Sequence, residues 1–172
     1  MSAASAELRR AFDAAFVLPA GATDETLEDV IAVRAGAEGY VVRARELSGI
    51  AENRRLSPVP SSAPDLLGLV SVRGLLVPVF SLPSLLGYAP DSEPLRWLLL
   101  VGKSEPLALA FHALTGFNRL PKSAFFPPER PGEARETASF EGQVRVVIGV
   151  SALVQSIRER LGRGIVEEGS VK

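Results

Sequence analysis

The chain of 172 residues has no cysteine and only one histidine, His112. Zinc sites draw mainly on Cys and His side chains, and nucleophilic catalysis often uses a Cys or a Ser with a His base. Because the chain has no Cys and a single His, we expect no bound metal and no cofactor. The lack of cysteine also excludes disulfide bonds. Their absence fits a protein of a reducing compartment.

An excess of charge of one sign and a long apolar run are also missing. The chain has 19 Lys and Arg residues against 20 Asp and Glu residues. A protein that neutralises phosphates needs clustered Lys and Arg, so nucleic acid is not an expected partner. No stretch of about 18 apolar residues is present, and the N-terminal residues lack the apolar run of a signal peptide. We therefore expect a cytoplasmic protein that does not insert into a membrane.

Buried pairs of carboxylates with shifted pKa values are the remaining route to catalysis, for instance in a hydrolase. The acidic residues that cluster are Asp24, Glu25, Glu28, Asp29, Glu167 and Glu168. They fall in an expected linker and in a C-terminal tail, where a solvated run of charge is the simpler interpretation. His112 follows an apolar strand and is interpreted as a packed structural residue. We therefore expect no enzymatic activity.

The N-terminal residues carry one apolar stripe. Leu8, Ala11, Phe12, Ala15 and Phe16 stand at helical spacing, which predicts an amphipathic helix followed by a linker within residues 1–27. A helix of two or three turns is not stable alone. We expect it to dock on the body of the protein or to extend a partner contact.

From residue 28 onward the pattern changes to short apolar runs separated by Gly and Pro, which indicates many short strands. We expect hairpins that turn at 35–39, at Arg73–Gly74 and at 102–106. Pro78 lacks a backbone N–H, so it is expected at an edge, a bulge or a strand end.

A short helical turn is predicted at Ser81–Gly87, with Ser81 as its N-cap and Gly87 after its end. A polar loop is predicted from Pro128 to Ser139, before the last strand.

The order of hairpin, Pro-containing connection, Val-rich strand and short helix appears twice. This similarity predicts an all-β fold with short helices, made of two small β-barrels packed together. The expected boundaries are 28–90 for barrel one, 91–150 for barrel two and 151–161 for a C-terminal helix. A flexible tail is expected at 162–172.

Three segments carry a resemblance to a known family: Arg45–Gly49, Pro58–Pro60 and Leu67–Val79. They resemble the CheW family of chemotaxis coupling proteins, which typically shows a Glu-Ile or Val-x-Glu-Val element, a Pro-bearing loop and a Gly-Val-x-Asn-Leu-Arg-Gly-x-Val-x-Pro-Val run. The resemblance covers about residues 28–161. It rests mainly on the spacing of Gly68, Arg73, Gly74 and Pro78.

The resemblance implies two five-stranded SH3-like barrels that carry no catalysis. It implies an adaptor that links the regulatory domain of a CheA-type histidine kinase, itself of the same fold, to the cytoplasmic tips of chemoreceptors. Apolar barrel faces would pair with the kinase, and a groove between the barrels would hold the helical receptor tip. The protein would then be cytoplasmic and associated with the membrane only through receptor arrays.

Four positions depart from the family pattern: Ser71 replaces the usual Asn, Ser81 and His112 replace Asp, and Gly149 replaces Asp or Asn. These changes motivate an alternative hypothesis. It is a diverged accessory protein that binds only one of the two partners, or that serves a chemosensory pathway other than motility.

The resemblance points to Arg73, Glu46, Gly68 and Gly74 as partner-binding residues. Each also has a structural interpretation: the Arg73 guanidinium can hold its turn, Glu46 can be a solvated charge, and the glycines can serve the backbone. An exposed apolar patch is also expected, because small barrels cannot bury every side chain of so apolar a run. Its candidates are Leu75 and Leu76, with Leu66, Leu67 and Val77.

Overall fold

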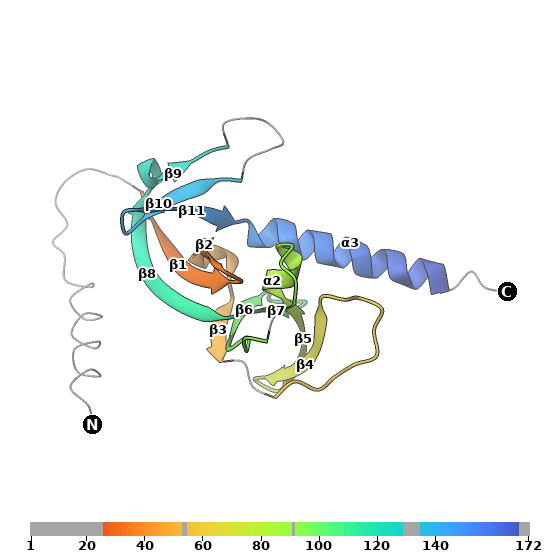
Figure 1. Ribbon diagram of the computed structural model, residues 1–172. Coiled ribbons are helices and arrows are strands. Elements are labelled where there is room, and N and C mark those ends of the chain that lie inside the picture. Colours follow the sequence, from red (N-terminus) through yellow and green to blue (C-terminus); the bar gives the residue numbers. More distant parts are fainter. Residues whose placement is uncertain (1–25, 53–54, 91, 129–134, 169–172) are drawn as a thin grey trace, which may run out of the picture.

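The computed structural model describes residues 26–52, 55–90, 92–128 and 135–168, with side chains described as far as Leu161 (Figure 1). The predicted helix within residues 6–16 lies outside the described residues. Within the described ranges, every helix is too short or too polar to cross a lipid bilayer.

Two β-sheets, each wrapped around its own core, make up the body of the protein. The first sheet, barrel one, has six strands in the order β8-β1-β2-β11-β10-β9. Its strands are β1 (Leu27–Ala35), β2 (Glu38–Arg43), β8 (Ala113–Pro121), β9 (Phe125–Phe126), β10 (Thr137–Phe140) and β11 (Gln143–Ile148).

The second sheet, barrel two, has five strands in the order β3-β6-β7-β5-β4. Its strands are β3 (Gly49–Glu52), β4 (Leu66–Val72), β5 (Leu75–Ser81), β6 (Trp97–Val101) and β7 (Leu107–Phe111). The short helices are the 3₁₀ turns η1 (Ala44–Glu46) and η2 (Lys122–Ala124) and the helix α2 (Leu82–Leu85), and the long helix α3 covers Val150–Glu168. The predicted all-β fold with short helices is confirmed, although one sheet has a sixth strand.

The predicted division of the chain near residue 90 is wrong. Barrel one takes the first two and the last four strands, and barrel two takes the five strands between them. Each sheet contains one parallel pair inside its strand order, β2 with β11 and β5 with β7. Parallel strands need a long crossover connection, so a search for consecutive hairpins cannot find these pairs.

The local turns and the helix cap, by contrast, form where the sequence predicts them. Arg73 and Gly74 both have positive φ, 51° and 81°, as a two-residue hairpin turn of type I′ requires. The Ser84 N–H donates a hydrogen bond of 3.2 Å to Ser81 Oγ, which caps α2 as predicted. Pro78 lies just before β5 begins its pairing with β7 at Val79, so it interrupts no bond of that ladder.

Two segments differ from the prediction. The polar loop expected to reach Ser139 instead contains β10, which begins at Thr137 and pairs with β11. The helix α3 runs to Glu168, where a flexible tail was expected from residue 162. It lies along both barrels, and its far end projects past them (Figure 1).

A third hydrophobic core joins the two barrels. The buried side chains of Ile31 in β1, Phe80 in β5 and Leu99 in β6 meet Val154 and Ile157 of α3 there. Because α3 supplies side chains to the core between the barrels, it holds them together.

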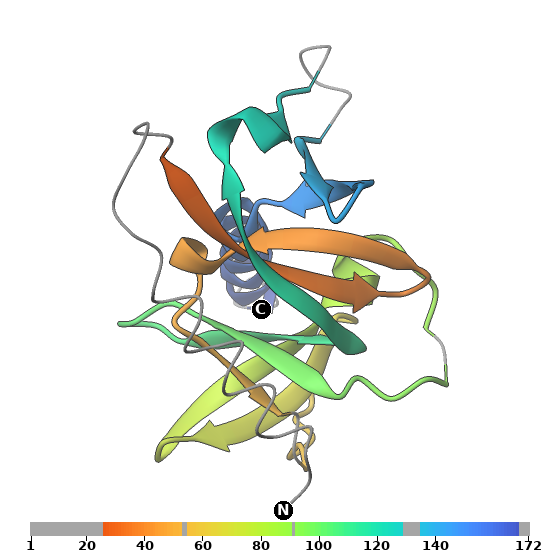
Figure 2. The same cartoon turned by 90° about the vertical axis from the view of Figure 1, so that its left-hand side faces the viewer.

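Polar contacts fasten the β1–β2 turn to barrel two, where Figure 2 shows the two parts side by side. The Gly36 N–H donates a 3.0 Å hydrogen bond to His112 Nδ1, and His112 is 2% exposed. His112 is thus a buried structural residue, as predicted. The hydroxyls of Tyr40 and Tyr88 lie 2.7 Å apart. Burial, with this hydrogen bond as the next cause, raises the pKa of the Tyr40 hydroxyl above its ordinary value.

Candidate protein-docking surfaces

The tip of the β4–β5 hairpin exposes two neighbouring leucines. Leu75 is 58% exposed and Leu76 is 70% exposed. Successive residues of a strand point to opposite faces of the sheet, so the two side chains belong to two different surfaces. The apolar patch predicted from the sequence is therefore real at the tip, but it is divided between two faces. Val77 is buried, and Leu66 is half-buried against the core between the barrels.

Leu75 lines a groove of about 420 Å³, here called the tip groove. Its apolar lining includes Leu47, Val72, Leu75 and Leu100, and the exposed cations Arg73 and Lys103 also line it. Leu47 lies in the connection between the two barrels, so the groove begins where barrel one passes into barrel two. The tip groove thus offers apolar contact with positive charge beside it.

Leu76 belongs to the opposite side of the hairpin. The register pairs it with Ser71, and the next pair on the same side is Leu69 with Pro78. These four residues form a surface called here the outer face. Ser71 is exposed, and Leu69 and Pro78 are half-buried. The outer face is uncharged and belongs to a sheet, which suits contact with another sheet.

The Arg73 guanidinium does not hold its turn. Within the described ranges it has no hydrogen-bond or ion-pair partner, and its side chain is exposed. The turn is instead set by the positive φ values of Arg73 and Gly74. The guanidinium is therefore free to meet an acidic or carbonyl group of a partner.

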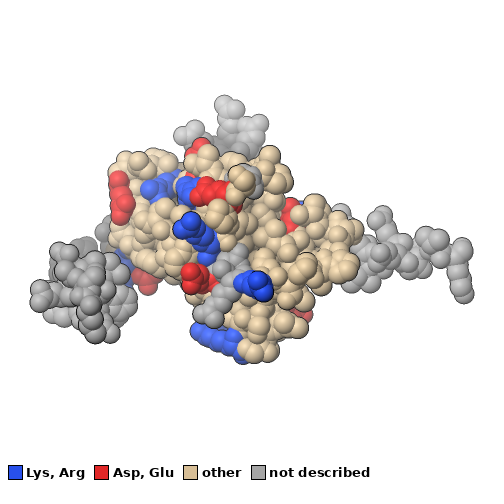
Figure 3. Space-filling view, turned by 60° about the horizontal axis from the view of Figure 1, so that its bottom comes forward, with Lys and Arg blue, Asp and Glu red and all other residues tan. Residues whose placement is uncertain are grey.

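Charge does not dominate the surface on this side of the molecule. In Figure 3, which brings the lower side of Figure 1 forward, Lys and Arg are interspersed with Asp and Glu amid broad uncharged areas. This surface therefore offers a partner broad uncharged areas with single charges beside them.

Glu46 has a role that sequence reasoning missed. Val150 N–H donates a 3.1 Å hydrogen bond to Glu46 Oε2, and Ser151 Oγ lies 3.2 Å from Glu46 Oε1. Glu46 therefore caps the N-terminus of α3, where a carboxylate also interacts favourably with the helix dipole. No local signal reveals this contact, because the two segments are more than a hundred residues apart.

Glu46→Ala is expected to lower the free energy of unfolding by about 1 kcal/mol, as the loss of a helix cap typically does. Urea unfolding measures the change, and Glu52→Ala, at an exposed position of β3, is the matched control. If both variants are equally stable while the Glu46 variant loses partner affinity, Glu46 acts as a contact residue and the capping role is wrong.

Gly68 is needed for its backbone conformation and for a close backbone approach. Its φ is 144°, it lies at a register shift of β4, and an added Cβ would stand 2.5 Å from the carbonyl oxygen of Ser57. Gly74 is exposed, and an added Cβ there would meet no atom within 4 Å. The structure thus brings Arg73, Gly74 and Leu75 together at the tip, with Leu76 on the other face, and places Gly68 and Glu46 in supporting positions.

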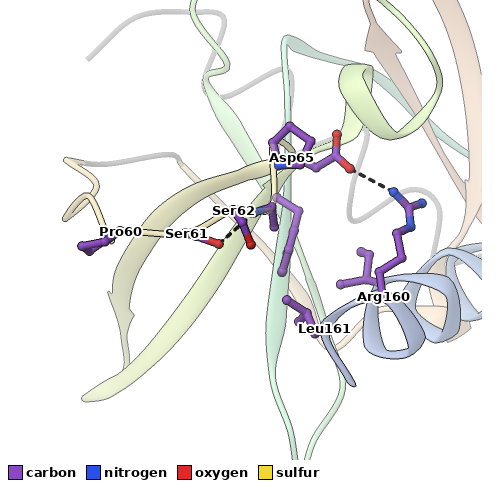
Figure 4. Close-up of a pocket in the computed structure, with 10 residues that line it drawn as sticks. Pro60, Ser61, Ser62, Asp65, Arg160 and Leu161 are labelled. Carbon is purple, nitrogen blue, oxygen red and sulfur yellow. Dashed lines mark hydrogen bonds and ion pairs between the residues drawn. The ribbon is translucent and has the colours of Figure 1, made fainter. Parts of the chain in front are cut away.

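A separate pocket of about 440 Å³ lies between residues 60–65 and α3 (Figure 4). Its charged lining residues, Asp65 and Arg160, form an ion pair of 3.0 Å with each other. Phe80 and Ile157 contribute apolar lining. The described residues include no group of three or more His, Cys, Asp or Glu side chains placed to hold a metal ion. The pocket therefore has a mixed lining, in which Ser61, Ser62 and the ion pair lie beside apolar side chains.

The model of the CheW-like domain family matches residues 29–158. The chain belongs to the CheW-like domain family. Proteins of this family are non-enzymatic scaffolds, so the expectation of no enzymatic activity is confirmed.

A solved structure shares the CheW-like fold at low sequence identity. It is the scaffolding protein TtCheW from Thermoanaerobacter tengcongensis, which matches with a TM-score of 0.63 at 13% identity. The match covers 72% of this chain and 89% of that one. A comparison with curated proteins gave no match. The CheW-like family and this fold support the role of a coupling adaptor.

Proposed function

We propose that this CheW-like protein couples the cytoplasmic tips of chemoreceptors to the regulatory domain of a CheA-type histidine kinase, in the cytoplasm at receptor arrays. The observation that carries the proposal is the pair Leu75 and Leu76, exposed on opposite faces of one hairpin. An adaptor needs two surfaces that can be occupied at the same time, and this hairpin presents two.

The tip groove is the surface for the receptor. A receptor tip is a helical hairpin, and helices dock by placing apolar side chains in a hydrophobic groove. The lining of Leu47, Val72, Leu75 and Leu100 supplies such a groove. Arg73 can meet a carboxylate or a carbonyl group at the end of a docked helix.

The outer face is the surface for the kinase. The regulatory domain of the kinase is expected to have the same barrel fold, so two sheets meet there. Contact of two sheets needs an uncharged surface with an apolar anchor, and Leu76 with Leu69 and Pro78 provides it. Ser71 lies beside Leu76, where it can donate a hydrogen bond at the rim of that contact.

Separate calorimetric titrations of the protein with a receptor cytoplasmic hairpin and with a kinase regulatory domain from the same genome test this function. We expect binding to both, each with one site per chain. Absence of binding to either one, with the protein shown to be folded by circular dichroism, contradicts the coupling role.

The alternative function, an accessory protein with one partner, has one observation in its favour. Of the four positions that depart from the family pattern, Ser81 and His112 are buried and act in the fold. Gly149 is exposed and precedes α3, where its carbonyl oxygen accepts a 3.1 Å hydrogen bond from Leu153 N–H. Ser71 alone lies in the outer face. Ser71 is therefore the position at which a change of kinase recognition is expected. Binding to the receptor hairpin alone would support this alternative.

A further inference from the structure

A third exposed apolar surface lies on barrel one, on strands that contribute no residue to the tip groove or to the outer face. Leu27 of β1 is 55% exposed and Phe117 of β8 is 63% exposed. The register pairs Leu27 with Pro121, and Ile31 with Phe117. The intervening residues Val30 and Leu120 point into the core of barrel one. Leu27 and Phe117 therefore share the other side of the same two strands, on which Ile31 is buried in the core between the barrels.

The exposed part of this side of β1 and β8 is called here the β1–β8 strip. Between its two apolar ends, Arg119 Nε lies 2.7 Å from Asp29 Oδ1 in an exposed ion pair. Figure 2 shows β1 and β8 on the face toward the viewer. The strip therefore offers two exposed apolar side chains, one at each end, with an ion pair between them.

The chain itself supplies an apolar stripe of matching length. From Leu8 to Phe16 the helical stripe predicted from the sequence would measure about 12 Å, at 1.5 Å per residue. From Leu27 to the level of Phe117, four residues along β1, the strip measures about 13 Å. A helix of residues 6–16 would therefore cover the strip from end to end.

The connection places this segment at the strip. Residues 17–26 lead directly into β1 at Leu27, which is itself one end of the strip. Ten residues span at most about 35 Å when extended, so the segment can reach every part of the strip. A tether of this length gives an effective concentration in the millimolar range. Contacts too weak to hold a separate molecule are then sufficient within one chain.

We propose that residues 6–16 dock in cis as an amphipathic helix on the β1–β8 strip, where the apolar stripe from Leu8 to Phe16 covers the span from Phe117 to Leu27. Packing on the strip supplies the stability that two or three turns of helix lack alone. The strip shares no residue with the tip groove or the outer face. The proposal does not depend on the identity of the partners that bind those two surfaces.

A disulfide test suits this protein, because the chain has no native cysteine to compete. The test pair is Ala11→Cys with Arg119→Cys, which join the middle of the stripe to the middle of the strip and leave the large apolar side chains in place. The control pair is Ala11→Cys with Val144→Cys, since Val144 is 69% exposed elsewhere on barrel one and reports what the tethered segment reaches without docking. After mild oxidation, intact mass and non-reducing electrophoresis measure the cross-linked monomer.

We expect the test pair to form an intramolecular disulfide about tenfold faster than the control pair. Equal rates for the two pairs would overturn the proposal. Cross-linked dimers in place of monomers would also overturn it, because they would assign the strip to a second copy of the chain.

Amide hydrogen exchange on the full chain is an independent measurement. Residues 6–16 are expected to show protection that Phe117→Ser lowers about tenfold, while the protection of β1 and β8 stays unchanged. Exchange of residues 6–16 at the unprotected rate in the parent chain, or protection that the Phe117 substitution does not alter, would contradict docking on this strip.

Discussion

Gly68→Ala is expected to lower the free energy of unfolding by about 3 kcal/mol or more, because the strained backbone and the clash act together. At a φ of 144° a side chain is strained in any surroundings. The added Cβ would stand 2.5 Å from Ser57 O, which is backbone and cannot rotate away. Ser57 and Leu69 also exchange two backbone hydrogen bonds of 2.8 Å, so the two segments cannot separate without losing them.

Gly74→Ala is the matched control. Its φ of 81° is also unfavourable for alanine, but its added Cβ would meet no atom within 4 Å. We expect a loss of about 1 kcal/mol from backbone strain alone. Urea denaturation of both variants measures the difference. Equal losses would mean that the close approach to Ser57 is not what requires glycine at position 68.

Leu75→Glu and Leu76→Glu are expected to separate the two binding activities. Leu75→Glu should weaken binding of the receptor hairpin, because it places a carboxylate in the apolar tip groove. Leu76→Glu should weaken binding of the kinase domain. Loss of a central apolar anchor typically costs 2 kcal/mol or more, which corresponds to a dissociation constant about 30-fold higher. Each variant should keep the affinity for its other partner within about twofold.

The exposure of both leucines keeps this test interpretable. Side chains that are 58% and 70% exposed contribute little to the core, so both variants should unfold within about 0.5 kcal/mol of the parent chain. Val144→Glu, at an equally exposed position of barrel one, is the control and should change neither affinity. If both leucine variants weaken the same partner, the hairpin tip is one surface and the assignment of two faces is wrong.

The elements that the sequence predicts correctly depend on neighbours in the chain. Ser81 caps α2 from three residues away, and Arg73–Gly74 reverses the chain within two residues. The exposure of some apolar side chains is also predictable, because the run on either side of this turn contains more apolar residues than a small barrel can bury. The sequence does not tell which of Leu66, Leu67, Leu75, Leu76 and Val77 these are.

The elements that sequence analysis misses depend on distant partners. The division of the chain between the barrels follows from the parallel pair of β2 with β11, which joins residues about a hundred positions apart. The capping role of Glu46 depends on the N-terminus of α3 at similar separation. The sequence indicates that Gly68 serves the backbone conformation. The reason that a glycine is needed there, the close approach of the Ser57 carbonyl oxygen across a loop, is visible only in the structure.

Formation of a ternary complex tests the central claim most directly, since two opposite faces of one hairpin should be occupied at once. Sedimentation velocity of the protein mixed with both the receptor hairpin and the kinase regulatory domain measures the mass of the assembly. For the parent chain we predict one complex that contains all three components. With Leu75→Glu only the binary complex with the kinase domain should remain, and with Leu76→Glu only the binary complex with the receptor hairpin. Competition between the two partners for the parent chain, with no ternary species at saturating concentrations, would contradict the account.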